Sequence, residues 1–95
     1  MASYKLSQEA EEDLIRIHQT GIREFGEAQA DKYYFAFIKR FEKIAEQPYL
    51  YQGVDDIREG YRRSVCGVDS NYYRIINNTV EIMAMFGNQN TDQWL

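Results

Sequence analysis

The sequence predicts an α+β fold: an N-terminal strand, then an antiparallel two-helix hairpin packed on a mostly antiparallel three- to four-stranded sheet. Apolar residues recur at helical spacing across residues 7–25 and again across 27–47. Three strand-like runs follow near residues 60–66, 69–76 and 79–86, separated by short turn signals. Because the break between the two helical segments is short, the helices must lie antiparallel.

The first helix is expected to begin after Ser7, because serine is a favoured N-cap residue. Its first turns carry the acidic residues Glu9, Glu11, Glu12 and Asp13, where the helix dipole stabilises negative charge. An apolar stripe follows at steps of four and three residues, as Ala10, Leu14, Ile17, Gly21 and Phe25, widened by Ile15, His18 and Ile22. The spacing predicts an amphipathic helix, preceded by a short strand at Tyr4-Lys5-Leu6.

A second helix is predicted from Glu27 to Gln47, because Gly26 interrupts the first helix and Pro48 cannot continue the second. A helix of that length would span about 30 Å. Its apolar stripe is Ala30, Tyr34, Phe37, Phe41 and Ile44. This second amphipathic face is expected to pack with the first helix over the sheet.

Two turn signals divide the predicted sheet. Residues 66–68 contain Gly67, and Asn77-Asn78 suits a two-residue hairpin loop. The segment 49–56, which follows Pro48 and contains Gly53, is expected to be a loop. The three strands should therefore form a meander after the helical hairpin.

The bulk composition indicates one domain over residues 1–95, with residues 87–95 as a polar tail. The chain is 44% hydrophobic and 15% aromatic, which is enough to build a core. A net charge of -4 and a pI of about 4.9 argue against a protein that binds DNA directly, which usually carries a basic excess. A single cysteine and the lack of a long apolar run indicate a cytoplasmic protein outside the membrane.

The residues that usually carry catalysis do not form a recognisable pattern. His18, the only histidine, sits beside a helical apolar stripe and is expected to be structural. Cys66 could pair with it as a nucleophile only if the fold brought the two together. Zinc would need more cysteine or histidine ligands than these two. The sequence therefore predicts a non-enzymatic protein with no metal or cofactor.

The stretch from residue 55 to 86 carries the strongest sign of a partner surface. Its basic residues are all arginines, namely Arg58, Arg62, Arg63 and Arg74, and Tyr61, Tyr72 and Tyr73 lie among them. Guanidinium groups bind carboxylates or phosphates in pairs of hydrogen bonds, and tyrosine adds contact area. The same pattern also fits a solvated sheet face with ion pairs inside the chain.

Five segments together resemble the ParE branch of the RelE/ParE toxin superfamily. They are YKLSQEAEEDLIRI at 4–17, REFGEAQADKYY at 23–34, IAEQPYLY at 44–51, DDIREGYRRSVCGVDSNYYRI at 55–75 and VEIMAMFG at 80–87. The resemblance implies a RelE/ParE-like fold and the toxin of a type II toxin–antitoxin module. It also implies DNA gyrase as the target and a ParD-type antitoxin as the partner, with a flexible segment that folds onto the toxin.

Antitoxin binding is expected to combine apolar anchors of the helical hairpin with ion pairs from the sheet. The predicted contacts are Leu14, Ile17, Ile22, Tyr34, Phe37, Arg62, Arg63 and Arg74, although Tyr34 and Phe37 are better explained as core residues. The predicted gyrase contacts are Arg58, Tyr61, Tyr72, Tyr73, Ala84 and Asn88.

The end of the chain departs from the family pattern, because Ala84 and Asn88 stand where relatives commonly carry basic residues. This departure favours a weakened toxin, or an inactive one that retains its fold and antitoxin binding. A RelE-type messenger-RNA ribonuclease is a further alternative, in which Tyr72 and the arginines Arg62, Arg63 and Arg74 would hold a phosphodiester.

Overall fold

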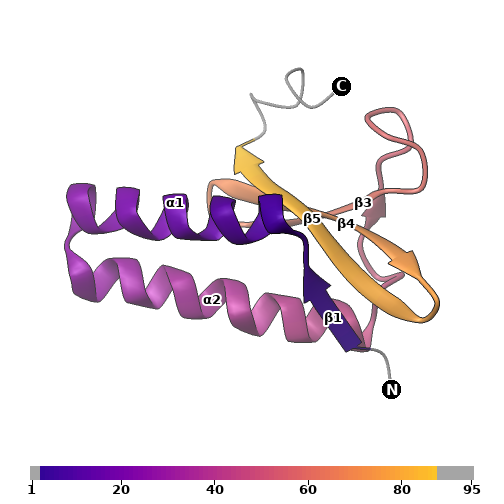
Figure 1. Ribbon diagram of the computed structural model, residues 1–95, viewed down its shortest axis with the longest axis horizontal. Coiled ribbons are helices and arrows are strands. Elements are labelled where there is room, and N and C mark those ends of the chain that lie inside the picture. The colour runs from indigo at the N-terminus through magenta and orange to yellow at the C-terminus, as the bar shows by residue number, and fades with distance from the viewer. Residues whose placement is uncertain (1–2, 88–95) are drawn as a thin grey trace.

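The computed structural model describes residues 3–87, and it confirms the predicted α+β fold. Two antiparallel helices, α1 and α2, pack on a five-stranded sheet (Figure 1). The elements are β1 (Ser3–Leu6), α1 (Gln8–Phe25), α2 (Glu27–Glu46), β2 (Gln52–Gly53), β3 (Arg62–Cys66), β4 (Asp69–Ile76) and β5 (Thr79–Gly87). The strands lie in the order β1-β5-β4-β3-β2. Only the β1–β5 pair is parallel within this described sheet.

The sheet has one strand more than the sequence predicted. Gln52 and Gly53 form β2, in a segment that was expected to be a loop. They pair with Arg63 and Arg62 at the edge of the sheet. Two residues are too few for any alternation of apolar and polar side chains, so the sequence carries no strand signal there.

The start of α1 is tied to the far end of the chain. The Ser7 hydroxyl accepts a hydrogen bond from the Ala10 amide at 3.0 Å, which confirms its predicted capping role. The same hydroxyl donates to the Met83 carbonyl at 2.9 Å. Ser7 therefore joins α1 to β5 while it caps the helix.

The two predicted turns are both present as two-residue hairpin loops. Asn77 and Asn78 have φ values of 51° and 61°, the left-handed conformation that a type I′ turn requires of both central residues. Between β3 and β4, Gly67 has a φ of 63°. These turns set the register in which β4 pairs with β3 and β5.

Each face of the sheet has its own cluster of buried side chains. The larger cluster joins the helices to the sheet and includes Phe37, Phe41, Ile44, Tyr73 and Met85. The smaller cluster consists of Val54, Tyr61 and Tyr72, with Ile57, Met83 and Phe86 packed against it. The segment between β2 and β3 supplies three of these side chains, so β4 is covered on both faces.

Candidate partner-binding site

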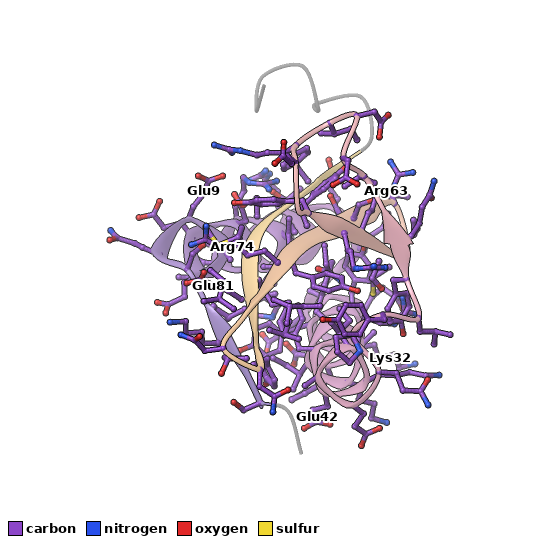
Figure 2. All side chains as sticks on the ribbon, turned by 90° about the vertical axis from the view of Figure 1, so that its right-hand side faces the viewer. Glu9, Lys32, Glu42, Arg63, Arg74 and Glu81 are labelled. Carbon is purple, nitrogen blue, oxygen red and sulfur yellow. The ribbon has the colours of Figure 1, made fainter. Side chains whose placement is uncertain are left out.

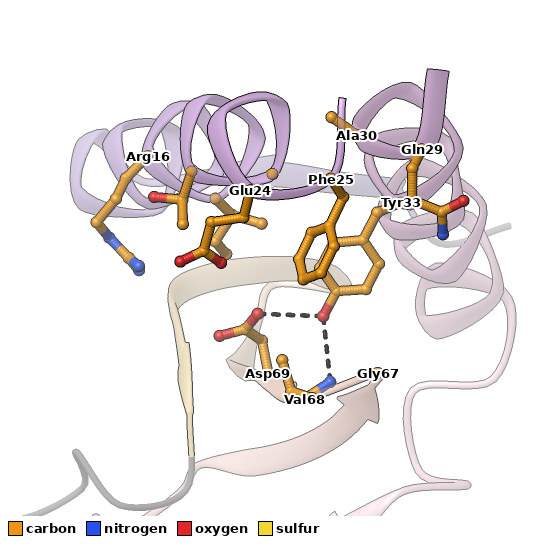
Figure 3. Close-up of a pocket in the computed structure, with 12 residues that line it drawn as sticks. Arg16, Glu24, Phe25, Gln29, Ala30, Tyr33, Gly67, Val68 and Asp69 are labelled. Carbon is orange, nitrogen blue, oxygen red and sulfur yellow. Dashed lines mark hydrogen bonds between the residues drawn. The ribbon is translucent and has the colours of Figure 1, made fainter. Parts of the chain in front are cut away.

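A cavity of about 520 Å³ opens between the C-terminal half of α1, the N-terminal half of α2 and the β3–β4 turn. We call it the hairpin cavity. Phe25 and Tyr33 lie on its helix side, and Val68 and Asp69 lie on its strand side (Figure 3). A hollow of this size, lined mainly by apolar groups with a few polar ones, is typical of a binding site.

The walls of the hairpin cavity expose large apolar side chains. Phe25 is 70% exposed and Val68 is 84% exposed, although both line the cavity. Gly21 and Ala30 also line the cavity, and a Cβ at Gly21 would lie 3.2 Å from the Ala30 Cβ. The two helices therefore approach each other closely at these small residues, and the exposed apolar side chains favour an apolar occupant.

Tyr33 holds the strand side of the cavity in place. Its hydroxyl oxygen lies 2.8 Å from the Cys66 carbonyl and 3.1 Å from an Asp69 carboxylate oxygen, and it accepts from the Val68 amide at 3.2 Å. Burial, followed by the nearby Asp69 charge, raises the pKa of Tyr33 to about 12. The Tyr33 ring also fills the space where a side chain at Gly67 would lie.

Charged groups surround the apolar part of the cavity. The Arg16 guanidinium donates to the Met85 carbonyl at 2.9 Å and lies 3.5 Å from Asp13, which in turn accepts from the Met85 amide at 3.0 Å. Glu24 and Asp69 place carboxylates on the cavity lining. Arg16 is thus anchored beside the end of β5 and remains about half exposed.

The predicted arginine surface is largely engaged inside the chain. Arg74 Nε lies 2.7 Å from a Glu81 carboxylate oxygen, and that hydrogen bond raises the pKa of Arg74 and lowers the pKa of Glu81. Arg62 donates to the Tyr51 carbonyl at 2.6 Å and stacks over the Tyr49 ring at 5.0 Å. The ion-pair interpretation of this stretch is therefore correct for Arg74.

Arg58 and Arg63 also have contacts within the chain. Arg58 lies over the Tyr61 ring at 5.5 Å. The Arg63 guanidinium makes a long contact of 3.5 Å with the Gln52 side chain. Figure 2 shows Arg63 at the outer edge of the sheet, apart from Arg74 and Glu81. The four guanidinium groups do not converge on one site.

Several predicted contact residues are placed in the core instead. Leu14 of α1 and Phe37 of α2 are both buried, and they belong to the cluster that joins the helices to the sheet. Ile17 is also nearly buried but lines the hairpin cavity, and Ile22 is 39% exposed. Tyr34 is half-buried and contacts the His18 ring at 5.3 Å.

Most of the predicted gyrase contacts within the described residues are also buried. Tyr73 is fully buried and donates to the Pro48 carbonyl at 2.6 Å, while Tyr72 stacks on Phe86 at 4.7 Å. Ala84 is fully buried opposite Tyr72, and Tyr61 is nearly buried. The side chains of these four residues are therefore buried in the folded chain. Asn88 lies outside the described residues.

His18 and Cys66, the possible catalytic pair, each have surroundings typical of a structural residue. His18 lies 2.8 Å from the Asp31 carboxylate, which ties α1 to α2. Cys66 is buried, and desolvation raises the pKa of its thiol. Across residues 3–87, no cluster of three or more histidine, cysteine or acidic residues is arranged to hold a metal ion. None of the helices in that range is long and apolar enough to span a membrane.

The sequence interpretation did not single out Val68, Asp69, Tyr33 or Phe25 as contact residues. Val68 was the best available signal, because a large apolar residue in a two-residue turn has no core to enter. Phe25 closes the α1 stripe next to Gly26. The sequence assigns Val68 to a turn and Phe25 to the apolar stripe of the first helix, and spacing does not show where the sheet ends.

The fold and the hairpin cavity define a small α+β domain with a surface suited to a protein partner. Residues 4–86 match the family described as ParE toxin of type II toxin-antitoxin system, parDE. The chain is 35% identical over 75 residues to Toxin ParE1 of Caulobacter vibrioides. The aligned residues make up 79% of this chain and 78% of that protein. The chain therefore belongs to the ParE toxins of type II toxin–antitoxin systems.

The fold is also similar to a solved structure. A chain of the chromosomal ParDE TA system from P. aeruginosa superposes with a TM-score of 0.81, at 18% identity. The superposition covers 92% of this chain and 96% of that one. At this identity the likeness shows the shared fold.

Proposed function

We propose that this ParE-family toxin inhibits DNA gyrase and is neutralised by a ParD-type antitoxin whose flexible segment binds the hairpin cavity. The observation that carries the antitoxin part is the cavity itself, with Phe25 and Val68 exposed on its walls. A flexible segment that folds on binding gains affinity by burying apolar anchors in such a groove. Family membership over residues 4–86 supports both parts of the proposal.

The antitoxin contacts proposed here keep Ile17, Ile22 and Arg63 from the sequence prediction. Ile17 lines the cavity, and Ile22 is partly exposed on the same helix. Arg63 is proposed to pair with an acidic side chain of the antitoxin, and its long contact of 3.5 Å with Gln52 supports this role. Phe25 and Val68 join this set on the strength of their exposure.

The ribonuclease alternative finds little support in the geometry. Tyr72 is fully buried, so its hydroxyl cannot reach a phosphodiester. Arg62 and Arg63 are neighbours in a strand and point to opposite faces, and Arg74 is paired with Glu81. A gyrase-directed, non-enzymatic toxin is therefore the function we propose.

Expression of the chain alone in bacteria tests the proposal. Growth arrest with filamentation and a DNA-damage response is the expected result, because a poisoned gyrase leaves broken DNA. Purified chain should also inhibit supercoiling by purified gyrase, and an added ParD-type antitoxin should relieve the inhibition. Translation arrest would support the ribonuclease, and normal growth with retained antitoxin binding would support an inactive toxin.

Ala84 and Asn88 stand where relatives commonly carry basic residues, but Ala84 is fully buried. A basic residue can therefore not be restored at position 84 without a structural cost. An arginine at this position would enter the cluster of Tyr72 and Phe86 and leave a charge without water. Ala84→Arg would therefore disturb the fold rather than restore a contact. Asn88→Arg alone tests whether a basic residue near the end of the chain strengthens inhibition of gyrase.

A further inference from the structure

We propose that Trp94 and Leu95 of this chain bind in its own hairpin cavity when no antitoxin is present. An apolar occupant would remove the cavity walls from water, because Phe25 and Val68 are 70% and 84% exposed there. A tryptophan removes about 150–250 Å² of surface from water when it is buried, so it is a strong apolar anchor.

The chain leaves the sheet at the cavity. Gly87, the last described residue, is paired with Asp69, and Asp69 lines the hairpin cavity. Paired residues in an antiparallel sheet have Cα atoms about 4.5–5.5 Å apart. The seven residues that lead from Gly87 to Trp94 reach at most about 25 Å when extended. The cavity is therefore within reach of Trp94.

The sequence of residues 88–95 suits this site. Residues 88–93 are all polar, and Trp94 and Leu95 are the apolar residues of this run. Asp92 is its one charged residue, and Arg16 is the cationic residue that lines the cavity. The indole N–H is a donor without an acceptor function, and the carboxylates of Glu24 and Asp69 offer acceptors on the lining.

The consequence for regulation rests on the proposed function. If the antitoxin segment uses the same cavity, it must displace Trp94 and Leu95 before it binds. Binding would then be weakened by the fraction of chains whose cavity is already filled. Truncation after Gly87 should accordingly lower the antitoxin dissociation constant, because the competing occupant is removed.

Trp94 is the chain's single tryptophan, so its fluorescence reports on this position alone. In the full chain without antitoxin, we expect an emission maximum shifted to shorter wavelength, and acrylamide quenching several-fold weaker, than in a free peptide of residues 88–95. Phe25→Asp and Val68→Asp should each return emission and quenching towards the peptide values. Both side chains are well exposed, so these changes spare the core.

Phe35→Asp is the matched control, because Phe35 is 60% exposed on α2 and does not line the cavity. It should leave the fluorescence unchanged, and circular dichroism should show all three variants folded. Peptide-like emission in the full chain would overturn the proposal. A blue shift that survives both cavity variants, or that vanishes on dilution because a second copy supplies the tryptophan, would also overturn it.

Addition of antitoxin separates this inference from the proposed function. Displacement of Trp94 to longer-wavelength emission supports both. Docked tryptophan that is unaffected while the antitoxin binds supports the docking and places the antitoxin elsewhere on the toxin.

Discussion

The hairpin cavity is lined by exposed apolar side chains, whereas two of the arginines in the arginine stretch have close partners within the chain. Arg62 and Arg74 face carbonyl, ring or carboxylate partners within the chain. Phe25 and Val68, by contrast, extend into solvent around a hollow. Charged residues that look ready for a partner in the sequence can thus stabilise the fold, whereas exposed apolar walls are the better mark of an interface.

The largest expected effect tests whether Tyr72 belongs to a core or to a contact surface. Tyr72→Ala should lower the free energy of unfolding by about 3–5 kcal/mol, the range for removing a large buried side chain. The residue is fully buried and stacks on Phe86 at 4.7 Å. Urea denaturation followed by circular dichroism measures this loss. A loss within about 0.5 kcal/mol, as at an exposed site, would contradict the burial.

The second prediction compares how a substitution in the hairpin cavity and one in the arginine stretch change the antitoxin dissociation constant. Val68→Asp should raise the antitoxin dissociation constant at least about tenfold, or 1.4 kcal/mol, because it places a carboxylate in an apolar contact. Arg63→Ala should raise it by at most about fivefold, the upper range for an exposed ion pair. Isothermal titration calorimetry on both variants measures the ratio. The reverse order would move the interface to the arginine stretch.

The third prediction concerns the hydroxyl that holds the cavity together. Tyr33→Phe should lower the free energy of unfolding by about 1 kcal/mol at neutral pH, because hydrogen bonds to the β3–β4 turn are lost. The pKa of Tyr33 is raised from 10.0 to about 12, so its protonated form is favoured in the folded chain. That contribution is complete below pH 10 and is lost as the pH rises towards 12.

A second tyrosine, Tyr73, also titrates at alkaline pH, and the comparison of the two proteins removes its effect on stability. The pKa of Tyr73 is also raised to about 12, mainly by burial, and Tyr73 is present in both proteins. Its contribution cancels when the wild type and the Tyr33→Phe variant are compared at the same pH. The stability difference should shrink across this alkaline range, and a constant difference would assign the effect to packing alone.

The smallest expected effect concerns the ion pair of the arginine stretch. Glu81→Gln should lower the free energy of unfolding by about 0.5 kcal/mol at neutral pH, a value discounted for the partly exposed Arg74. The pKa of Glu81 is lowered from 4.5 by the Arg74 hydrogen bond. The stabilisation is therefore present above pH 4.5 and disappears as the pH falls through the depressed value. Urea denaturation across that acidic range measures it, with Lys5→Ala as the control for the weaker 3.6 Å contact.

The elements that depend on neighbouring residues could be predicted from the sequence. The Ser7 cap, the helix break at Gly26 and the Asn77-Asn78 turn all act through local backbone geometry, and the structure contains each of them. The buried parts of the two apolar helix stripes also pack with the sheet as expected, whereas Phe25 at the end of the first stripe is exposed. The resemblance to the ParE toxins rested on these same segments and is confirmed by the family match.

The candidate site was predicted less well, because the function of a strand residue depends on what covers it. Tyr72 and Tyr73 are neighbours in β4 and lie on opposite faces of the sheet, as alternation along a strand requires. This alternation does not reveal that both faces are covered, one by the helices and the other by the segment between β2 and β3. The arginine partners Tyr51 and Glu81 are likewise supplied by other elements.

The sequence by itself determined the helix boundaries, the hairpin turns, the strand order within the meander and the family, because each is encoded in short-range spacing or in matched segments. Only the tertiary structure decided that Tyr72, Tyr73 and Ala84 are core residues and that Phe25 and Val68 surround a cavity. The physical reason is that burial is a property of contacts between distant segments. The spacing of residues along one element sets which side chains share a face, but not what that face meets.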